Sequence, residues 1–271
     1  MAATERRHPR STGLGSMTAR EVVALMDDEE WRTAAAVRQA APCIVTAADR
    51  VADCLRHNGR IVLMGAGTSG RIAIQEAAEM RPTFGVPEGQ FLALVAGGLS
   101  CGSAAITSSE DDTRAPVATL AKMGIGPNDA VIGLAASGTT PFVLAGLRAG
   151  RAEGAWTCAI ANNADAPVLE IADTAICLDT GAEILTGSTR LQAGTAQKLA
   201  LNRITTAAMV VNGRVVENHM VDLVVSIAKL ERRAVRIVCD LCGLDEHDAR
   251  RLLESNDWSV RGALACFGDR L

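Results

Sequence analysis

Short apolar runs and amphipathic stretches alternate along the middle of the chain. Five runs predict buried strands, over residues 60–64, 91–95, 130–135, 157–161 and 174–178. Each run is almost continuously apolar, as expected for strands that are covered on both faces. Helical patterns separate several of them, over 71–80, over 115–123 and from residue 141 onward. This alternation predicts an α/β fold with a parallel sheet, whose ligands bind at the carboxyl ends of the strands.

The two ends of the chain have mainly helical patterns. Residues 1–16 are polar and irregular, and helical periodicity then continues to about His57, with a break near Pro42. Glu21 follows Thr18 by three residues, which is the spacing of a capping box. Further helices are expected over 188–211 and 218–238, with two short helices in the tail. We therefore expect three parts: an N-terminal arm with helices (1–57), a sheet domain (58–240) and a small helical lobe (241–271).

Composition excludes several classes of function. The chain has 271 residues, of which 48% are hydrophobic and 21% charged, as in ordinary globular proteins. Aromatic residues make up 3% and Tyr is absent, which argues against base-stacking surfaces for nucleic acid. The net charge of −4 gives no basic field, so a bound phosphate has to be held locally. Neither a membrane-spanning run nor a signal peptide is apparent, so we expect a cytoplasmic protein without membrane partners.

Two cysteines form an isolated CxxC pattern at Cys239 and Cys242. A structural zinc site needs a second pair of ligands at matching spacing, and no such pair follows. The pattern therefore favours two thiols packed on a helix, and no metal is expected.

Three loops rich in glycine and hydroxyl groups are the main candidates for ligand binding. The first, residues 65–70, matches GxGxxG and carries Thr68 and Ser69. A dinucleotide site also needs an acidic residue at the end of the second strand, where this chain has Ala96 followed by two glycines. The hydroxyls, together with backbone N–H groups at a helix start, instead indicate an anion site.

The second loop contains Ser137, Gly138 and Thr139 after the third strand, and the third loop contains Ser188 and Thr189 before a long helix. Any one of these loops by itself is better explained as a helix cap or a turn. Three such loops in one α/β domain favour a cradle for a phosphomonoester.

Acidic residues follow two of the predicted strands. Glu76 and Glu79 are three residues apart and share one face of a mostly apolar helix. Glu110 begins an acidic run, Glu110-Asp-Asp, ahead of another helix. The alternatives are solvated side chains for the first pair and helix-dipole capping for the acidic run.

Several of these motifs together resemble the N-acetylmuramic acid 6-phosphate etherases, a sugar isomerase (SIS) domain family related to the glucokinase regulatory protein. The similar segments are 65–71, Glu79 with 82–85, 110–112, 136–138 and 185–198. The resemblance extends over nearly the whole chain. It implies a SIS-type three-layer domain with a central parallel sheet, flanking helices and a small C-terminal helical lobe.

The resemblance also implies a reaction. The family cleaves the D-lactyl ether of N-acetylmuramic acid 6-phosphate by elimination and hydration, without metal or organic cofactor, and serves the recycling of cell-wall sugar. Glu79 would act as the general acid for the departing lactate and Glu110 as the base that removes the C2 proton. Members are homodimers. The positions that would hold the sugar phosphate are Gly67, Thr68, Ser69, Ser137, Gly138, Thr139, Ser188, Thr189 and Lys198.

The chain departs from the family pattern at five positions. Thr139 stands where Arg is usual and Arg81 where Pro is usual; the others are His8 for Asn, Val224 for Gln and Ile227 for Asn. Losing an arginine and two amides changes what a sugar pocket accepts. Three alternatives therefore stay open: an etherase paralogue with an altered substrate, a non-catalytic sugar-phosphate sensor, and an aldose–ketose isomerase on the same fold.

Overall fold

The computed structural model describes residues 2–98 and 109–268, which form two compact units. The first unit comprises residues 1–77 and 90–208, and the second comprises 78–89 and 209–271.

A five-stranded parallel sheet forms the centre of the first unit. Its order is β2-β1-β3-β4-β5, and every neighbouring pair is parallel. The strands are β1 (Ile61–Gly65), β2 (Phe91–Val95), β3 (Ala130–Leu134), β4 (Trp156–Ala161) and β5 (Thr174–Cys177). The predicted strands differ from these bounds by at most one residue at either end. The α/β class with a parallel sheet is therefore confirmed.

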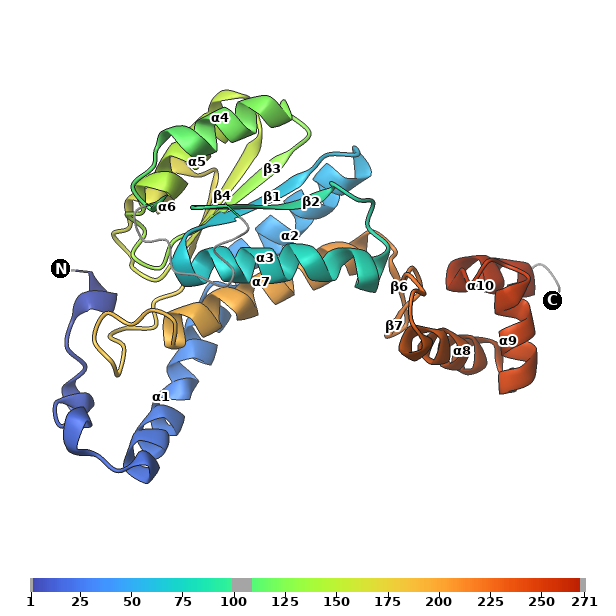
Figure 1. Cartoon of the computed structure of the whole chain (residues 1–271), viewed down its shortest axis with the longest axis horizontal. Coiled ribbons are helices and arrows are strands. Elements are labelled where there is room, and N and C mark those ends of the chain that lie inside the picture. Colours follow the sequence, from blue (N-terminus) through green and yellow to red (C-terminus); the bar gives the residue numbers. More distant parts are fainter. Residues whose placement is uncertain (1, 99–108, 269–271) are drawn as a thin grey trace. The chain divides into compact units, whose positions relative to one another are not determined.

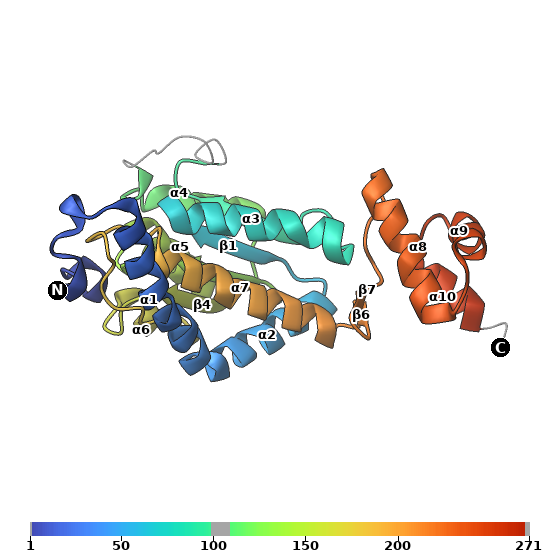
Figure 2. The same cartoon turned by 90° about the horizontal axis from the view of Figure 1, so that it is seen from below.

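Helices cover both faces of this sheet (Figure 1). One face carries α4 (Arg114–Met123), α5 (Pro141–Ala152) and α6 (Pro167–Ile171). The other carries α2 (Ala41–Arg56), α3 (Gly67–Phe84) and α7 (Gln192–Val211), and Figure 2 views the protein from this side. Because every strand is enclosed, β1, β3 and β4 are buried at each position, which explains their unbroken apolar runs.

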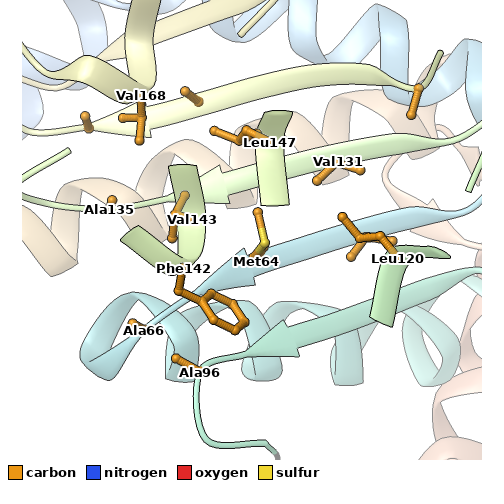
Figure 3. Packing of buried hydrophobic residues seen from close by; sticks show 14 of the residues in the cluster. Met64, Ala66, Ala96, Leu120, Val131, Ala135, Phe142, Val143, Leu147 and Val168 are labelled. Carbon is orange, nitrogen blue, oxygen red and sulfur yellow. The ribbon is translucent and has the colours of Figure 1, made fainter. Parts of the chain in front are cut away.

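Apolar side chains packed beneath α4 and α5 fix the start of α5, and the second loop directly precedes this helix. Figure 3 shows the ring of Phe142 directed toward Ala66 and Ala96, with Met64 and Val143 beside it. Phe142 is 2% exposed and lies in the first turn of α5. Truncating such a side chain to alanine costs about 3–5 kcal/mol, so the position of this helix start is strongly determined.

The N-terminal segment combines short helical turns with one long helix, α1 (Ala19–Gln39). The capping box predicted at its start is present, since Thr18 and Glu21 bond reciprocally. The turns η1 (Ala3–Glu5), η2 (Pro9–Ser11) and η3 (Leu14–Ser16) precede it. His8 is buried with its Nε2 3.4 Å from Glu29 Oε2, which ties these turns to α1.

The second unit is a helical lobe with its own apolar core. It contains α8 (Ala228–Cys242), α9 (Glu246–Glu254) and α10 (Val260–Gly268) around Val235, Leu253 and their neighbours. The expected division placed a boundary at residue 240, whereas α8 packs within this lobe. Cys239 and Cys242 are free thiols that pack against the same core, as predicted, and burial raises the pKa of both.

The helix expected over 218–238 is wrong in its first half. Residues there form a short antiparallel hairpin, β6 (Val215–Val216) and β7 (His219–Met220), and α8 begins only at Ala228. Glu217 has φ +53°, a left-handed conformation that ends any helix and suits a tight turn. Two valines precede this turn, and β-branched side chains favour strands over helices.

Residues 78–89 join the lobe through Asp222 and its neighbours. Arg261 and Arg214 both contact the Asp222 carboxylate, and the Val224 amide donates to the Pro82 carbonyl at 3.3 Å. Val224 and Ile227, two of the departures from the family pattern, are exposed here, and Arg81 pairs with Glu88 on the surface. Within the described residues, no helix has the length and apolarity that crossing a membrane requires.

Candidate active site

The order of the sheet determines where a ligand site forms. β1 leads to β2 on one side, while β3, β4 and β5 follow on the other, so the connections reverse between β1 and β3. Loops that follow adjacent strands at such a switch point diverge and leave a crevice at the carboxyl ends of the strands. The first loop follows β1 and the second follows β3. The fold therefore places the two predicted phosphate loops next to each other.

The first loop is shorter than predicted, because α3 begins at Gly67 rather than near Arg71. Thr68 and Ser69 are therefore residues of the first helical turn. Gly67 has φ +53°, a conformation that glycine adopts without strain. The unpaired N–H groups at this helix start attract negative charge.

Glu110 lies against this helix start. A Cβ atom built on Gly67 would be 3.2 Å from Glu110 Oε1, so the missing side chain leaves room for the carboxylate. The Glu110 main chain is fixed independently, because its carbonyl accepts a hydrogen bond from the Phe142 amide at 3.0 Å. One predicted catalytic residue is thus held beside the first predicted phosphate loop.

The acidic run continues into a helix cap. Asp112 Oδ1 accepts hydrogen bonds from the amides of Arg114 and Ala115 at 2.9 and 3.0 Å, at the start of α4. The bond from Ala115, followed by that from Arg114, holds the pKa of Asp112 below its ordinary value. The capping alternative is therefore correct for Asp112, while Glu110 two residues earlier lies beside the loop.

A buried chain of hydrogen bonds connects the first loop to α7 and β4. Ser69 donates to Gln197 Oε1 at 2.8 Å, and Gln197 donates to Asn162 Oδ1 at 3.0 Å. Asn162 in turn donates to the Leu178 carbonyl. Gln197 and Asn162 are fully buried and Ser69 is 7% exposed. The Ser69 hydroxyl therefore uses its proton inside the protein and holds the loop in position.

The third loop meets the first through Gly194. A Cβ atom at Gly194 would be 3.2 Å from the methyl group of Thr68 and 3.3 Å from the Thr189 carbonyl oxygen. The predicted helix start at Ser188 is wrong by four residues, since α7 begins at Gln192. Ser188 and Thr189 instead lie in turns ahead of it, partly exposed.

A buried carboxylate caps α7. Glu183 is fully buried and accepts from the Gln192 and Ala193 amides at 3.1 and 2.9 Å. Burial raises the pKa of Glu183, and these two amide bonds oppose the rise. Glu183 thus fixes the helix that follows the third loop.

The second loop keeps its hydroxyls accessible. Thr139 donates to Ser137 Oγ through its amide at 3.2 Å and through its hydroxyl at 3.0 Å. Gly138 has φ +73°, and a Cβ atom there would collide with Ala166. Asn163 bonds to the carbonyls of Ala136 and Ser137. The backbone of this loop is tightly held while its hydroxyls face outward.

The N-terminal arm, residues 2–11, reaches two of the three loops. Thr4 and Asn163 bond reciprocally, through the Thr4 amide at 3.2 Å and the Thr4 hydroxyl at 3.1 Å. The carboxylate of Glu5 lies 3.2 Å from the position of a Cβ on Gly187 in the third loop. The arm is therefore part of the wall around the loops.

Lys198, a predicted binding residue, has a partner inside the protein. Its ammonium lies 2.5 Å from Glu76 Oε2, and Thr205 donates to Glu76 Oε1 at 2.6 Å. Glu76 is 4% exposed, so this pair links α3 and α7 from within. A role of Lys198 in substrate binding stays a prediction.

Glu79 is placed differently from Glu76. It is exposed and belongs to the part of α3 that is assigned to the second unit. Its catalytic role stays a prediction.

Four residues that hold the loops in place were not predicted: Asn162, Asn163, Glu183 and Gln197. Asn162 and Asn163 carried a signal, because polar residues directly after the fourth apolar run occupy the carboxyl end of a strand. Gln197 and Glu183 carried no such signal, because polar or glycine residues lie close to both in the sequence, and only the structure shows that they are fully buried and bonded.

No buried group of metal ligands occurs among the described residues. The one candidate cluster there, Asp245, His247 and Asp248, is fully exposed on the helical lobe.

Comparison with known proteins identifies the class first. Residues 43–151 match the family model described as the glucokinase regulatory protein N-terminal SIS domain. Phosphoheptose isomerase from Francisella tularensis superposes with a TM-score of 0.57 at 15% identity, over 72% of this chain and all of that one. Phosphoheptose isomerase GmhA from Neisseria gonorrhoeae superposes with a TM-score of 0.54 at 20% identity, over 70% of this chain and 99% of that one. The fold is therefore that of a SIS domain.

Close relatives then identify the family. N-acetylmuramic acid 6-phosphate etherase from Salmonella agona (strain SL483) is 41% identical over 261 residues, covering 96% of this chain and 88% of the relative. The protein of that name from Geobacillus thermodenitrificans is 42% identical over 262 residues, covering 97% and 89%. The chain belongs to the N-acetylmuramic acid 6-phosphate etherase family.

Proposed function

We propose that this chain is an N-acetylmuramic acid 6-phosphate etherase, a carbon–oxygen lyase that yields N-acetylglucosamine 6-phosphate and D-lactate. The 41% identity to a protein named as an etherase, over 96% of the chain, supports the activity. One structural observation carries the assignment of chemistry: the Glu110 carboxylate lies beside Gly67 at the start of α3. The carboxylate beside this loop supports Glu110 as the base that removes the C2 proton.

The reaction begins with the open-chain sugar, whose aldehyde acidifies the proton on C2. Glu110 removes that proton, and the C3–oxygen bond breaks to leave a C2–C3 double bond conjugated with the aldehyde. Glu79 gives its proton to the departing lactate oxygen, because an alkoxide is a poor leaving group. Two carboxyl groups in opposite protonation states serve both steps.

Hydration completes the proposed cycle. Glu110, now protonated, and Glu79, now ionised, exchange roles as water adds to C3 and a proton returns to C2. Ring closure then gives N-acetylglucosamine 6-phosphate. Atoms and charges balance without an oxidant, a reductant or a cofactor.

Isotope labelling tests the reaction and its mechanism together. Purified protein incubated with N-acetylmuramic acid 6-phosphate is expected to release D-lactate in one-to-one ratio with N-acetylglucosamine 6-phosphate. In D₂O containing ¹⁸O, the sugar product should carry deuterium at C2 and solvent oxygen at C3. Solvent oxygen in the lactate instead of at C3 of the sugar would exclude elimination while leaving the activity intact.

A second candidate, a non-catalytic sugar-phosphate sensor, is favoured by the match of residues 43–151 to the regulatory SIS domain model. It predicts binding of the sugar phosphate with no lactate formed over many hours. An aldose–ketose isomerase would instead interconvert hexose phosphates, which the same assay detects as a change in the sugar product.

We further propose that the enzyme is a cytoplasmic homodimer that serves cell-wall sugar recycling. Exposed apolar side chains on α1 support self-association, with Trp31 at 64% and Val23 at 56% exposure. Light scattering on the eluting protein tests this, with Trp31→Glu expected to shift the mass toward the monomer.

A further inference from the structure

A cavity of about 450 Å³ adjoins the second loop. The loop contributes Ser137 and Thr139 to its lining, and the segment after β4 contributes Asn163 and Asp165. The N-terminal arm contributes Arg6, which is the cationic side chain in this lining. The cavity is thus built jointly by a strand-end loop and by residues more than a hundred positions away in the sequence.

The position of Arg6 is set by its neighbours. Thr4 is buried and bonded reciprocally to Asn163, and the Arg6 amide donates to the Ala3 carbonyl at 3.1 Å in the same turn. The backbone is therefore fixed on both sides of Glu5. The Arg6 side chain itself is exposed and free to turn into the cavity.

Arg6 has no ion pair and no side-chain hydrogen bond with any residue that the structure describes. Asp165 and Asp179 also line the cavity, but neither lies within ion-pair distance of Arg6. Asp179 accepts a hydrogen bond from the Gly181 amide at 3.1 Å. An unpaired guanidinium beside two hydroxyls suits an anionic group, and the carboxylates suit hydroxyl groups of the same ligand.

We propose that Arg6 is a substrate-binding residue, which supplies the positive charge for the phosphate held at the second loop. This inference rests on the proposed function and specifies how that site selects phosphorylated sugars. Thr139 lines the same cavity and stands where the etherase pattern has an arginine. The positive charge that this arginine supplies from the loop therefore comes from Arg6 of the arm in this chain.

Binding measurements test how much the Arg6 guanidinium contributes to the affinity for the phosphate group. We expect Arg6→Gln to lower the affinity for N-acetylglucosamine 6-phosphate about 10- to 100-fold, as measured by titration calorimetry. Unphosphorylated N-acetylglucosamine should bind the variant and the wild type equally. Arg20→Gln, which removes an exposed arginine of α1 outside this cavity, is the matched control and should change neither affinity.

Moving the charge provides a second test. Thr139→Arg in the Arg6→Gln background should restore most of the phosphate-dependent affinity, because it returns a guanidinium to the same cavity from the other wall. In turnover, Arg6→Gln should raise KM far more than it lowers kcat. Unchanged affinity in Arg6→Gln, or no recovery on adding Thr139→Arg, would overturn the proposal.

The etherase proposal and the binding role of Arg6 can be refuted independently of each other. If the protein binds N-acetylglucosamine 6-phosphate through Arg6 but releases no D-lactate, the etherase proposal fails and the binding role stands. If it releases D-lactate and Arg6→Gln behaves like wild type, the binding role fails alone. Because Arg6 has no described partner, its substitution should leave the melting temperature within about 1 °C of wild type.

Discussion

The first and second loops have similar sequences and different physical roles. Both place serine, threonine and glycine at the carboxyl end of a central strand. In the first loop, Ser69 is buried and donates to Gln197, and the Thr68 methyl packs against Gly194. In the second loop, Ser137 and Thr139 bond to each other and line a cavity. Composition alone therefore does not separate a hydroxyl that supports a loop from one that faces a ligand.

The largest expected effect concerns the carboxylate beside the first loop. Glu110→Gln should lower kcat for D-lactate release about 10²- to 10⁴-fold, because the amide cannot accept the C2 proton. The variant should fold normally, since the Glu110 carbonyl, and not its side chain, bonds the Phe142 amide. Retained product affinity with lost turnover is the result to look for. Full activity in Glu110→Gln would refute the catalytic role of Glu110.

The backbone of the second loop should tolerate change poorly. Gly138→Ala introduces a Cβ at a positive φ and against Ala166, so we expect a loss of several kcal/mol in the free energy of unfolding. Gly126→Ala is the matched control, because nothing lies within 4 Å of a Cβ there. Urea denaturation of both variants measures the difference. Equal stability would show that the loop is not rigidly held.

Serine substitutions test the contrast between the loops directly. Ser69→Ala leaves Gln197 Oε1 buried without its donor and should destabilise the protein by about 1–3 kcal/mol. Ser137→Ala should lower the free energy of unfolding by less than about 1 kcal/mol but lower the affinity for N-acetylglucosamine 6-phosphate about 10-fold. Thermal melts and calorimetry on both variants give the comparison. The reverse pattern would exchange the roles assigned to the two loops.

The smallest effect should appear at low pH. The pKa of Asp112 is lowered in the folded state from its ordinary value of 3.8 by the bonds from Ala115 and Arg114. The unfolded chain therefore binds the proton more tightly, and this stabilisation is present above pH 3.8 and lost as pH falls through the folded pKa. Asp112→Asn keeps an acceptor but does not titrate. The melting-temperature gap between wild type and variant should narrow on acidification, and a constant gap would contradict this assignment.

Much of the sheet could be predicted because burial on both faces requires unbroken apolar runs. β1, β3 and β4 are buried at every position, and their predicted bounds were within one residue. The switch point then placed the first two loops at the correct edge. Helix starts were less accurate, since Gly67 begins α3 in a conformation that sequence patterns assign to a loop.

The contacts that complete the site could not be predicted, because they join distant segments. Ser69 meets Gln197 across 128 positions, and Lys198 meets Glu76 across 122. No local pattern specifies such pairs. The hairpin at residues 215–220 was missed for a different reason: a short valine-rich segment fits strand and helix patterns alike, and only the left-handed Glu217 decides between them.

The reciprocal bond between Thr4 and Asn163 has a consequence for biosynthesis. The two residues are 159 positions apart, so the arm is translated early yet has no docking site until β4 has emerged from the ribosome. Closing so long a loop is also slow relative to local folding. The nascent protein therefore carries an undocked, cationic arm at least until Asn163 has emerged, and the cavity beside the second loop is not complete before then.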